Sequence, residues 1–201
     1  MTLRTFVSFA LLAASLGCVD AMAAKPTTPD AVIAPAKDGQ RIEVSFEDKR
    51  VYVDIGDKHL VGESQSLKRF WRRGAGGEAV LEVKTGDDGF KLRTPADKLL
   101  WKVKVDKEKI KIADNEDMTH AWTIKFKADE NTKVTDAKDK EIGALKFNKE
   151  TGKIKLKDAS DKELFVVESG RRSNAYAALL LKDVPEEQRD IILGELFVRG
   201  L

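Results

Sequence analysis

The chain has 201 residues, of which 36 are lysine or arginine and 34 are aspartate or glutamate, so its net charge is +2. Charged residues make up 35% of the sequence with nearly balanced signs, which argues against nucleic acid as a partner, because a nucleic-acid-binding face needs an excess of positive charge. The one cysteine, Cys18, excludes a disulfide framework within a single chain.

The first 23 residues have the pattern of a secretory signal peptide. Arg4 precedes an apolar run over residues 6–16, and the small residues 21–23 form an A-x-A cleavage site. The run is shorter than the roughly 20 apolar residues that a transmembrane helix needs. No later segment is apolar enough to span a membrane. We therefore expect an exported protein, either periplasmic or secreted.

A second interpretation of the same segment is a bacterial lipoprotein signal. In that case cleavage after Gly17 would leave Cys18 lipidated at the new amino terminus, and the protein would be anchored to the envelope. Both interpretations place the mature chain outside the cytoplasm.

Residues 24–40 contain three prolines among small and polar residues, and we predict a disordered linker there. Residues 41–201 are long enough for one domain with its own core. From residue 41 onward, apolar and polar side chains alternate in short segments; Ile42, Val44 and Phe46, for example, alternate with Glu43 and Ser45. This period of two predicts a mainly β fold of about 12 antiparallel strands with one face in water.

Lysines occupy the polar face of many of these segments. Such lysines are typical of sequences that prevent strand edges from pairing with other molecules. The lysines can therefore be explained without a specific binding partner.

A pair of aspartates recurs at an interval of 22 residues in the second half of the chain. The pairs are Asp114 with Asp117, Asp136 with Asp139, and Asp158 with Asp161. A polar turn repeated at this period, between alternating segments, indicates stacked β-hairpins. A lysine directly follows Asp139 and Asp161, which opposes calcium binding, so we interpret the aspartates as turn formers.

The pattern changes near the carboxy terminus. Residues 175–181 are apolar on every side and follow two candidate N-caps, Ser173 and Asn174, which predicts a short buried helix. Asp183 and Glu186 have capping-box spacing around Pro185. The apolar segment 191–198 that follows is compatible with a helix or a strand.

The hairpins with Asp-x-x-Asp-Lys turns, followed by the apolar stretches 175–181 and 191–198, resemble the tubby C-terminal-like fold. Phospholipid scramblases and LURP-one-related proteins belong to that group. The resemblance covers the chain in outline from residue 41 and implies a closed β-barrel around a central hydrophobic helix. The alternative architecture is an open meander or a β-sandwich with a helix on one face.

One local segment stands out as a candidate binding site. Its residues are Lys68, Arg69, Phe70, Trp71, Arg72 and Arg73, followed by a glycine-rich stretch. Four cations with two interleaved aromatic rings suit an anionic membrane surface or an acidic partner, and they also suit a polyanion through stacking and phosphate contacts. The simpler interpretation is a strand with its aromatic side chains in the core.

No constellation of residues indicates catalysis, a cofactor or a metal ion. His59 and His120 are the only histidines, and neither has ligand-type spacing to a cysteine or another histidine. We therefore predict a non-enzymatic exported β-domain that binds or scaffolds. Two alternatives stay open: a carrier of a small apolar ligand in a barrel lumen lined by Trp101, Val103, Trp122 and Ile124, and a hydrolase.

Overall fold

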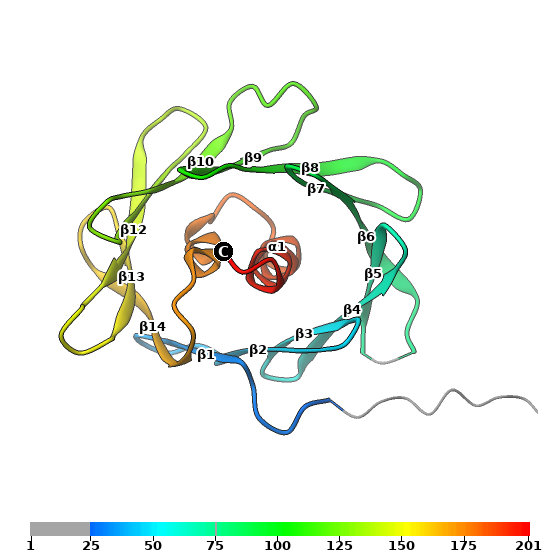
Figure 1. The fold of residues 1–201 in the computed structure, drawn as a ribbon, viewed down its shortest axis with the longest axis horizontal. Coiled ribbons are helices and arrows are strands. Elements are labelled where there is room, and N and C mark those ends of the chain that lie inside the picture. Colours follow the sequence, from blue (N-terminus) through cyan, green and yellow to red (C-terminus); the bar gives the residue numbers. More distant parts are fainter. Residues whose placement is uncertain (1–24, 75) are drawn as a thin grey trace, which may run out of the picture.

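The computed structural model describes residues 25–74 and 76–201, and the predicted export signal with Cys18 lies outside these residues. The described chain folds into a closed antiparallel barrel of fourteen strands with two helices in its interior (Figure 1). Each strand pairs with its sequence neighbours, and β1 pairs with β14 to complete the ring. The prediction of a β meander that closes around a carboxy-terminal helix is confirmed, and the open sheet and the sandwich are excluded.

The strands are β1 (Ala31–Pro35), β2 (Ile42–Glu47), β3 (Arg50–Ile55), β4 (Lys58–Gln65), β5 (Lys68–Arg73), β6 (Ala79–Gly86), β7 (Gly89–Arg93), β8 (Leu99–Val105), β9 (Lys109–Ala113), β10 (Trp122–Phe126), β11 (Thr132–Thr135), β12 (Glu141–Phe147), β13 (Ile154–Asp158) and β14 (Glu163–Gly170). The predicted number of about 12 strands is too low. Among the strands missed is β11, which has four residues and a single large apolar side chain, Val134, so alternation could not reveal it.

The linker predicted for residues 24–40 is replaced over Ala31–Pro35 by strand β1. Ala31, Val32 and Ile33 are buried, and β1 hydrogen-bonds to β14 on one side and β2 on the other. The prolines suggested a linker because proline cannot donate a ladder hydrogen bond, but Pro35 is the last residue of the strand, where this loss is tolerated.

The repeated aspartate pairs form turns at one rim of the barrel. Asp139 and Asp161 have positive φ angles of 60° and 65°, a conformation that aspartate tolerates better than most residues. The first acid of each pair, Asp136 or Asp158, accepts hydrogen bonds from two backbone N–H groups of its own turn. The interpretation of the aspartates as turn formers is confirmed for these two pairs. Asp114 and Asp117 lie in the longer loop 114–121, where Asn115 accepts from the Thr119 N–H.

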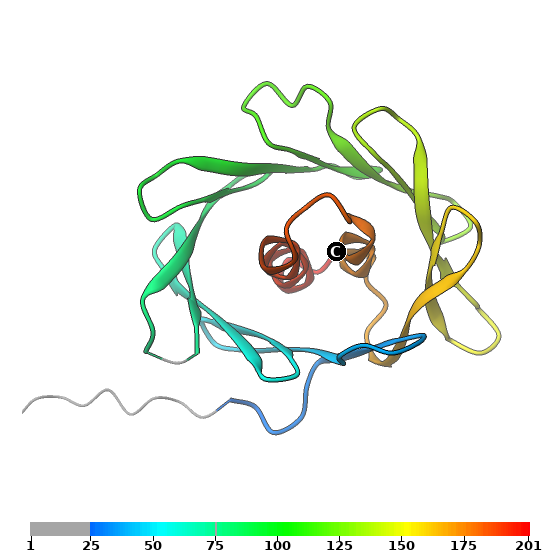
Figure 2. The same ribbon diagram turned by 180° about the vertical axis from the view of Figure 1, so that it is seen from behind.

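Two helices occupy the interior of the barrel, as both views of the ribbon show (Figures 1 and 2). The first, η1 (Asn174–Leu180), is a 3₁₀-helix whose predicted cap, Ser173, accepts a hydrogen bond from the Ala175 N–H. The second, α1 (Glu186–Val198), shows that the ambiguous segment 191–198 is helical. It begins after Pro185 without a side-chain cap, so the predicted capping box does not form. Neither helix is long and apolar enough to cross a membrane in the part of the chain that the structure describes.

Glycine lets α1 lie close to the barrel wall. A Cβ atom on Gly194 would lie 2.9 Å from the Trp71 ring, closer than real Cβ contacts allow, and 3.0 Å from a methyl group of Val53, which is tighter than most such contacts. The apolar side chains of α1 and η1 and the inward faces of the strands form one continuous core. The interior is therefore packed with protein around the helices.

Polar side chains connect α1 to the wall at several levels. Its contacts are Glu187 with Arg73, Gln188 with Trp101, Asp190 with Lys58, and Glu195 with Arg69 and Trp71. Glu195 is fully buried; one carboxylate oxygen accepts from Arg69 at 2.9 Å and the other accepts from the Trp71 indole at 2.9 Å. A buried carboxylate with two partners at these distances fixes the rotation and height of α1.

Replacing Glu195 should therefore cost much more than replacing Glu187, an acid of the same helix whose side chain is 23% exposed. We expect Glu195→Gln to lower the free energy of unfolding by about 3 kcal/mol, because the largely buried Arg69 guanidinium loses its counter-charge. Glu187→Gln, whose partner Arg73 is 68% exposed, should change it by less than about 1 kcal/mol. Urea unfolding followed by tryptophan fluorescence measures both values, and equal losses would contradict the anchoring role.

A second prediction concerns Asp190 and the pH dependence of the folding stability. The carboxylate is fully buried, and burial raises its pKa to about 6 despite the Lys58 ammonium at 3.2 Å. The folded protein then holds the proton more tightly than the unfolded chain. The resulting stability is complete below the unfolded pKa of about 3.9 and is lost as the pH rises through about 6.

Asp190→Asn removes this titration and should make stability less dependent on pH. We expect the free energy of unfolding of the variant, relative to the natural protein, to rise by about 2 kcal/mol between pH 4 and pH 7. Parallel pH profiles for Asp190→Asn and the natural protein would overturn this account.

Candidate functional site

Rows of lysines cross the outer wall of the barrel. Lys68, Lys84, Lys91 and Lys102 stand directly opposite one another on β5, β6, β7 and β8. Further rows consist of Lys104 with Lys111, of Lys109 with Lys125 and Lys133, and of Lys146 with Lys155. We call these eleven residues the lysine rows. They extend from β5 to β13.

Acids compensate part of this charge. Glu82 pairs with Lys68 at 2.7 Å, Asp88 with Lys104 at 3.0 Å and Glu141 with Lys133 at 2.9 Å. Glu163 pairs with Lys155 at 2.6 Å, and Glu116 contacts both Lys91 and Lys102. Five acids thus contact the eleven lysines in the described part of the chain, so the rows keep a positive excess. The overall charge balance of the sequence therefore conceals a separation of charge on the folded surface.

A depression of about 230 Å³ lies on the outer wall over β6, β7 and β8. Its cations are Lys84, Lys91, Arg93, Lys102 and Lys104. Asp88 is the acid at its edge, and contact with Lys104 lowers the pKa of this carboxyl below its usual value. Gly86 and Gly89, which have no side chains, also line the hollow. We call this feature the basic depression.

A larger, shallow hollow of about 490 Å³ lies over β12 and β13. Its lining includes Lys146, Lys153, Lys155 and Lys157 together with Asn131 and Asn148. Two separate hollows of the outer wall are thus lined by clusters of lysines.

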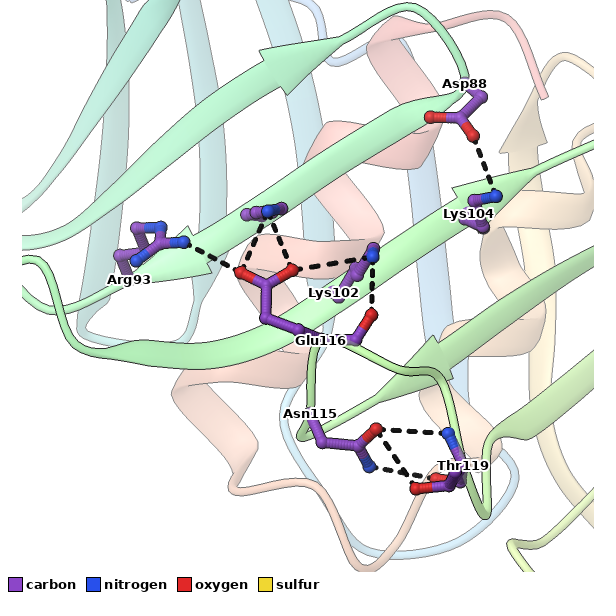
Figure 3. A network of polar contacts seen from close by, with 8 residues as sticks. Asp88, Arg93, Lys102, Lys104, Asn115, Glu116 and Thr119 are labelled. Atoms are coloured by element: carbon purple, nitrogen blue, oxygen red, sulfur yellow. Dashed lines mark hydrogen bonds and ion pairs between the residues drawn. The ribbon is translucent and has the colours of Figure 1, made fainter.

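The loop 114–121 reaches from the rim onto the first lysine row, and we call it the Glu116 loop. The carboxylate of Glu116 contacts Lys91 at 2.7 Å, Arg93 at 3.1 Å and Lys102 at 3.5 Å (Figure 3). Its backbone carbonyl accepts a further hydrogen bond from Lys102 at 2.6 Å. The hydrogen bond and charge of Lys91 lower the pKa of Glu116 below its usual value, so this carboxylate stays charged at neutral pH.

The structure divides the candidate segment Lys68–Arg73 between two faces of β5. Lys68 faces outward and begins the first lysine row. Arg69 and Trp71 instead bind Glu195 of α1, and Trp71 is fully buried. Arg73 binds Glu187 through two hydrogen bonds of 2.7 and 3.1 Å.

The two remaining residues of that segment share the outward face with Lys68. Phe70 is half-buried, and Arg72 donates to the Gly77 carbonyl at 2.6 Å. The six residues therefore do not form one exposed patch. Three of them anchor the interior helix, and the basic surface continues from Lys68 along the rows.

Neither histidine belongs to a cluster of potential metal ligands. His59 contacts Asp54 at 2.6 Å, whereas His120 lies in the Glu116 loop with a positive φ angle of 55°. Among residues 25–74 and 76–201, no three histidine, cysteine, aspartate or glutamate side chains gather in positions that could hold a metal ion.

Sequence reasoning missed the lysine rows and the role of Glu116. Alternation identified the outward lysines, but the strand register that places one lysine opposite another depends on turn lengths. A signal for the Glu116 loop was present in the sequence, since its Asp114–Asp117 block lacks the lysine that follows the second acid of the later blocks.

Comparisons with protein-family models, with curated proteins and with solved structures found no match to this chain.

Proposed function

We propose that this chain is a non-enzymatic, exported binding domain that holds an anionic partner against the lysine rows of its outer wall. The observation that carries the proposal is the direct opposition of lysine to lysine on adjacent strands, in seven pairs between β5 and β13. Two features support it: the closure of the barrel and the repulsion between the opposed lysines.

Closure of the barrel argues against the simplest explanation of the lysines, which is protection of strand edges. Lysines protect open sheet edges from pairing with other molecules, but a closed barrel has no open edge. The folded protein therefore does not need them for that purpose. Solubility alone is served as well by interspersed charges of both signs.

Repulsion supports a positive role for the rows. Like charges directly opposite on neighbouring strands destabilise a sheet by roughly a few tenths of a kcal/mol per pair. Exchanging some lysines with the glutamates and aspartates found elsewhere in this sequence would remove that cost at the same net charge. An anionic partner would turn the repulsion into a favourable interaction, and part of its affinity would come from counterion release.

The proposal changes which residues of the Lys68–Arg73 segment are expected to bind. Lys68 remains a contact, whereas Arg69, Trp71 and Arg73 are engaged by α1. The alternative of an apolar ligand in the lumen has less support, because the side chains named for it, including Trp101 and Ile124, belong to the core around the helices.

The likeness to the tubby C-terminal-like fold is likewise a proposal. An apolar helix enclosed by a closed antiparallel barrel supports it. Fourteen strands exceed the number expected from that resemblance, and fold likeness does not carry function by itself.

The row on β9, β10 and β11 gives the most direct test. We expect the triple variant Lys109→Gln, Lys125→Gln, Lys133→Gln to bind dextran sulfate at least about tenfold more weakly than the natural protein at low salt, since each lysine near an anionic surface contributes about 1 kcal/mol. The slope of log affinity against log salt concentration should also become shallower. Fluorescence anisotropy with labelled dextran sulfate measures both quantities.

A matched control removes the same charge elsewhere. Lys98, Lys107 and Lys138 are exposed residues in loops between strands, and their replacement by glutamine should change the affinity by less than about threefold. If both triple variants lose the same affinity, net charge alone explains the binding. If the natural protein binds none of dextran sulfate, polygalacturonate and vesicles of phosphatidylglycerol, the proposed function is wrong.

A further inference from the structure

The Glu116 loop differs from the short aspartate turns at the same rim of the barrel. The turns 136–140 and 158–162 are short and closed by their own aspartates, whereas eight residues separate β9 from β10. Asn115 holds the longer loop in shape by accepting from the backbone N–H of Thr119 at 3.0 Å and donating to its carbonyl at 2.9 Å (Figure 3). Lys102 binds the Glu116 carbonyl as well. The loop is thus fixed in a position that places Glu116 on the wall.

The cations under Glu116 already form a site for one carboxylate. Lys91, Arg93 and Lys102 converge on it from the outward faces of β7 and β8. Arg93 is only 16% exposed, and its Nε is buried without a hydrogen-bond partner. Arg93 also contacts Asp97, whose exposed carboxylate lies 3.5 Å away, so three cations face two acids and leave one positive charge in excess. The same three cations line the adjoining basic depression.

The first lysine row has the geometry of a track for an extended chain. Its lysines follow one another across four adjacent strands, at steps of roughly 4.8 Å. Within the described residues, the exposed large apolar side chains are Phe46 and Leu67, and neither lines the depression. A membrane-binding face normally adds apolar side chains that enter the bilayer, so these features favour a linear polymer.

We propose that Lys91, Arg93 and Lys102 form a carboxylate subsite for a linear polycarboxylate, such as an acidic polysaccharide, and that Glu116 occupies this subsite until a carboxylate of the polymer displaces it. The proposal rests on the proposed function and specifies its ligand class and its regulation. Displacement exchanges one carboxylate for another on the same cations, and the polymer then continues along the row to Lys84 and Lys68.

The test compares polymer binding by variants that differ at the subsite. Glu116→Gln should bind labelled polygalacturonate about fivefold or more tightly than the natural protein, because the subsite is no longer occupied by the protein's own carboxylate. Glu108→Gln makes the same charge change at an exposed turn and should alter the affinity less than about twofold. Adding Lys91→Gln and Lys102→Gln to Glu116→Gln should remove the gain. Thermal unfolding of each variant checks that the barrel is intact.

The outcomes separate this inference from the broader function. If the natural protein binds polygalacturonate but Glu116→Gln and Glu108→Gln change the affinity equally, the subsite is wrong and the binding function stands. If Glu116→Gln strengthens binding to phosphatidylglycerol vesicles and not to polygalacturonate, the ligand class is wrong. If neither the natural protein nor any variant binds polygalacturonate, dextran sulfate or these vesicles, the inference and the proposed function fail together.

Discussion

The size of the barrel is the constraint on which the rest of the structure depends. Eight strands enclose an interior that their own side chains fill, whereas sixteen or more leave an aqueous channel. Fourteen strands lie between these cases and need additional material inside. Here η1 and α1 supply it, which explains why residues 175–181 are apolar on every side: each side of the helical segment faces part of the same interior.

Apolar contacts alone would not determine the rotation and the axial position of α1 inside the barrel. Rotation or sliding of α1 would exchange one aliphatic contact for another of similar energy. Buried charged groups discriminate between such arrangements, because any shift leaves a charge without its partner. We interpret Glu195 and Asp190 in this way, since Arg69, Trp71 and Lys58 lie on the wall at two different heights of the helix.

The sequence was sufficient for most of the strands, for the aspartate turns and for an apolar segment enclosed by the barrel, because these depend on local alternation and on side chains that bond within their own turns. It was not sufficient for β5. There Phe70 and Trp71 place an aromatic ring on each face of the strand, and the four remaining residues are all cations. On β5, the contact partners determine which face of the strand is buried. The partner of Arg69 is Glu195, which is 126 residues away in the sequence. The lysine rows were hidden for a related reason, because opposition between strands depends on register, which alternation does not fix.

The position of the interior segment has a consequence for the order of folding. Both helices follow β14 in the chain, yet the seam that closes the barrel joins β14 to β1, the first strand. We expect the helices to pack against the strands before the seam forms, because the apolar inward faces of the strands are buried against these helices. Closure is therefore a late step that requires nearly the whole chain, and contacts between such distant segments make folding slow. A chain truncated before residue 174 could complete every hairpin and still lack the material on which the barrel closes.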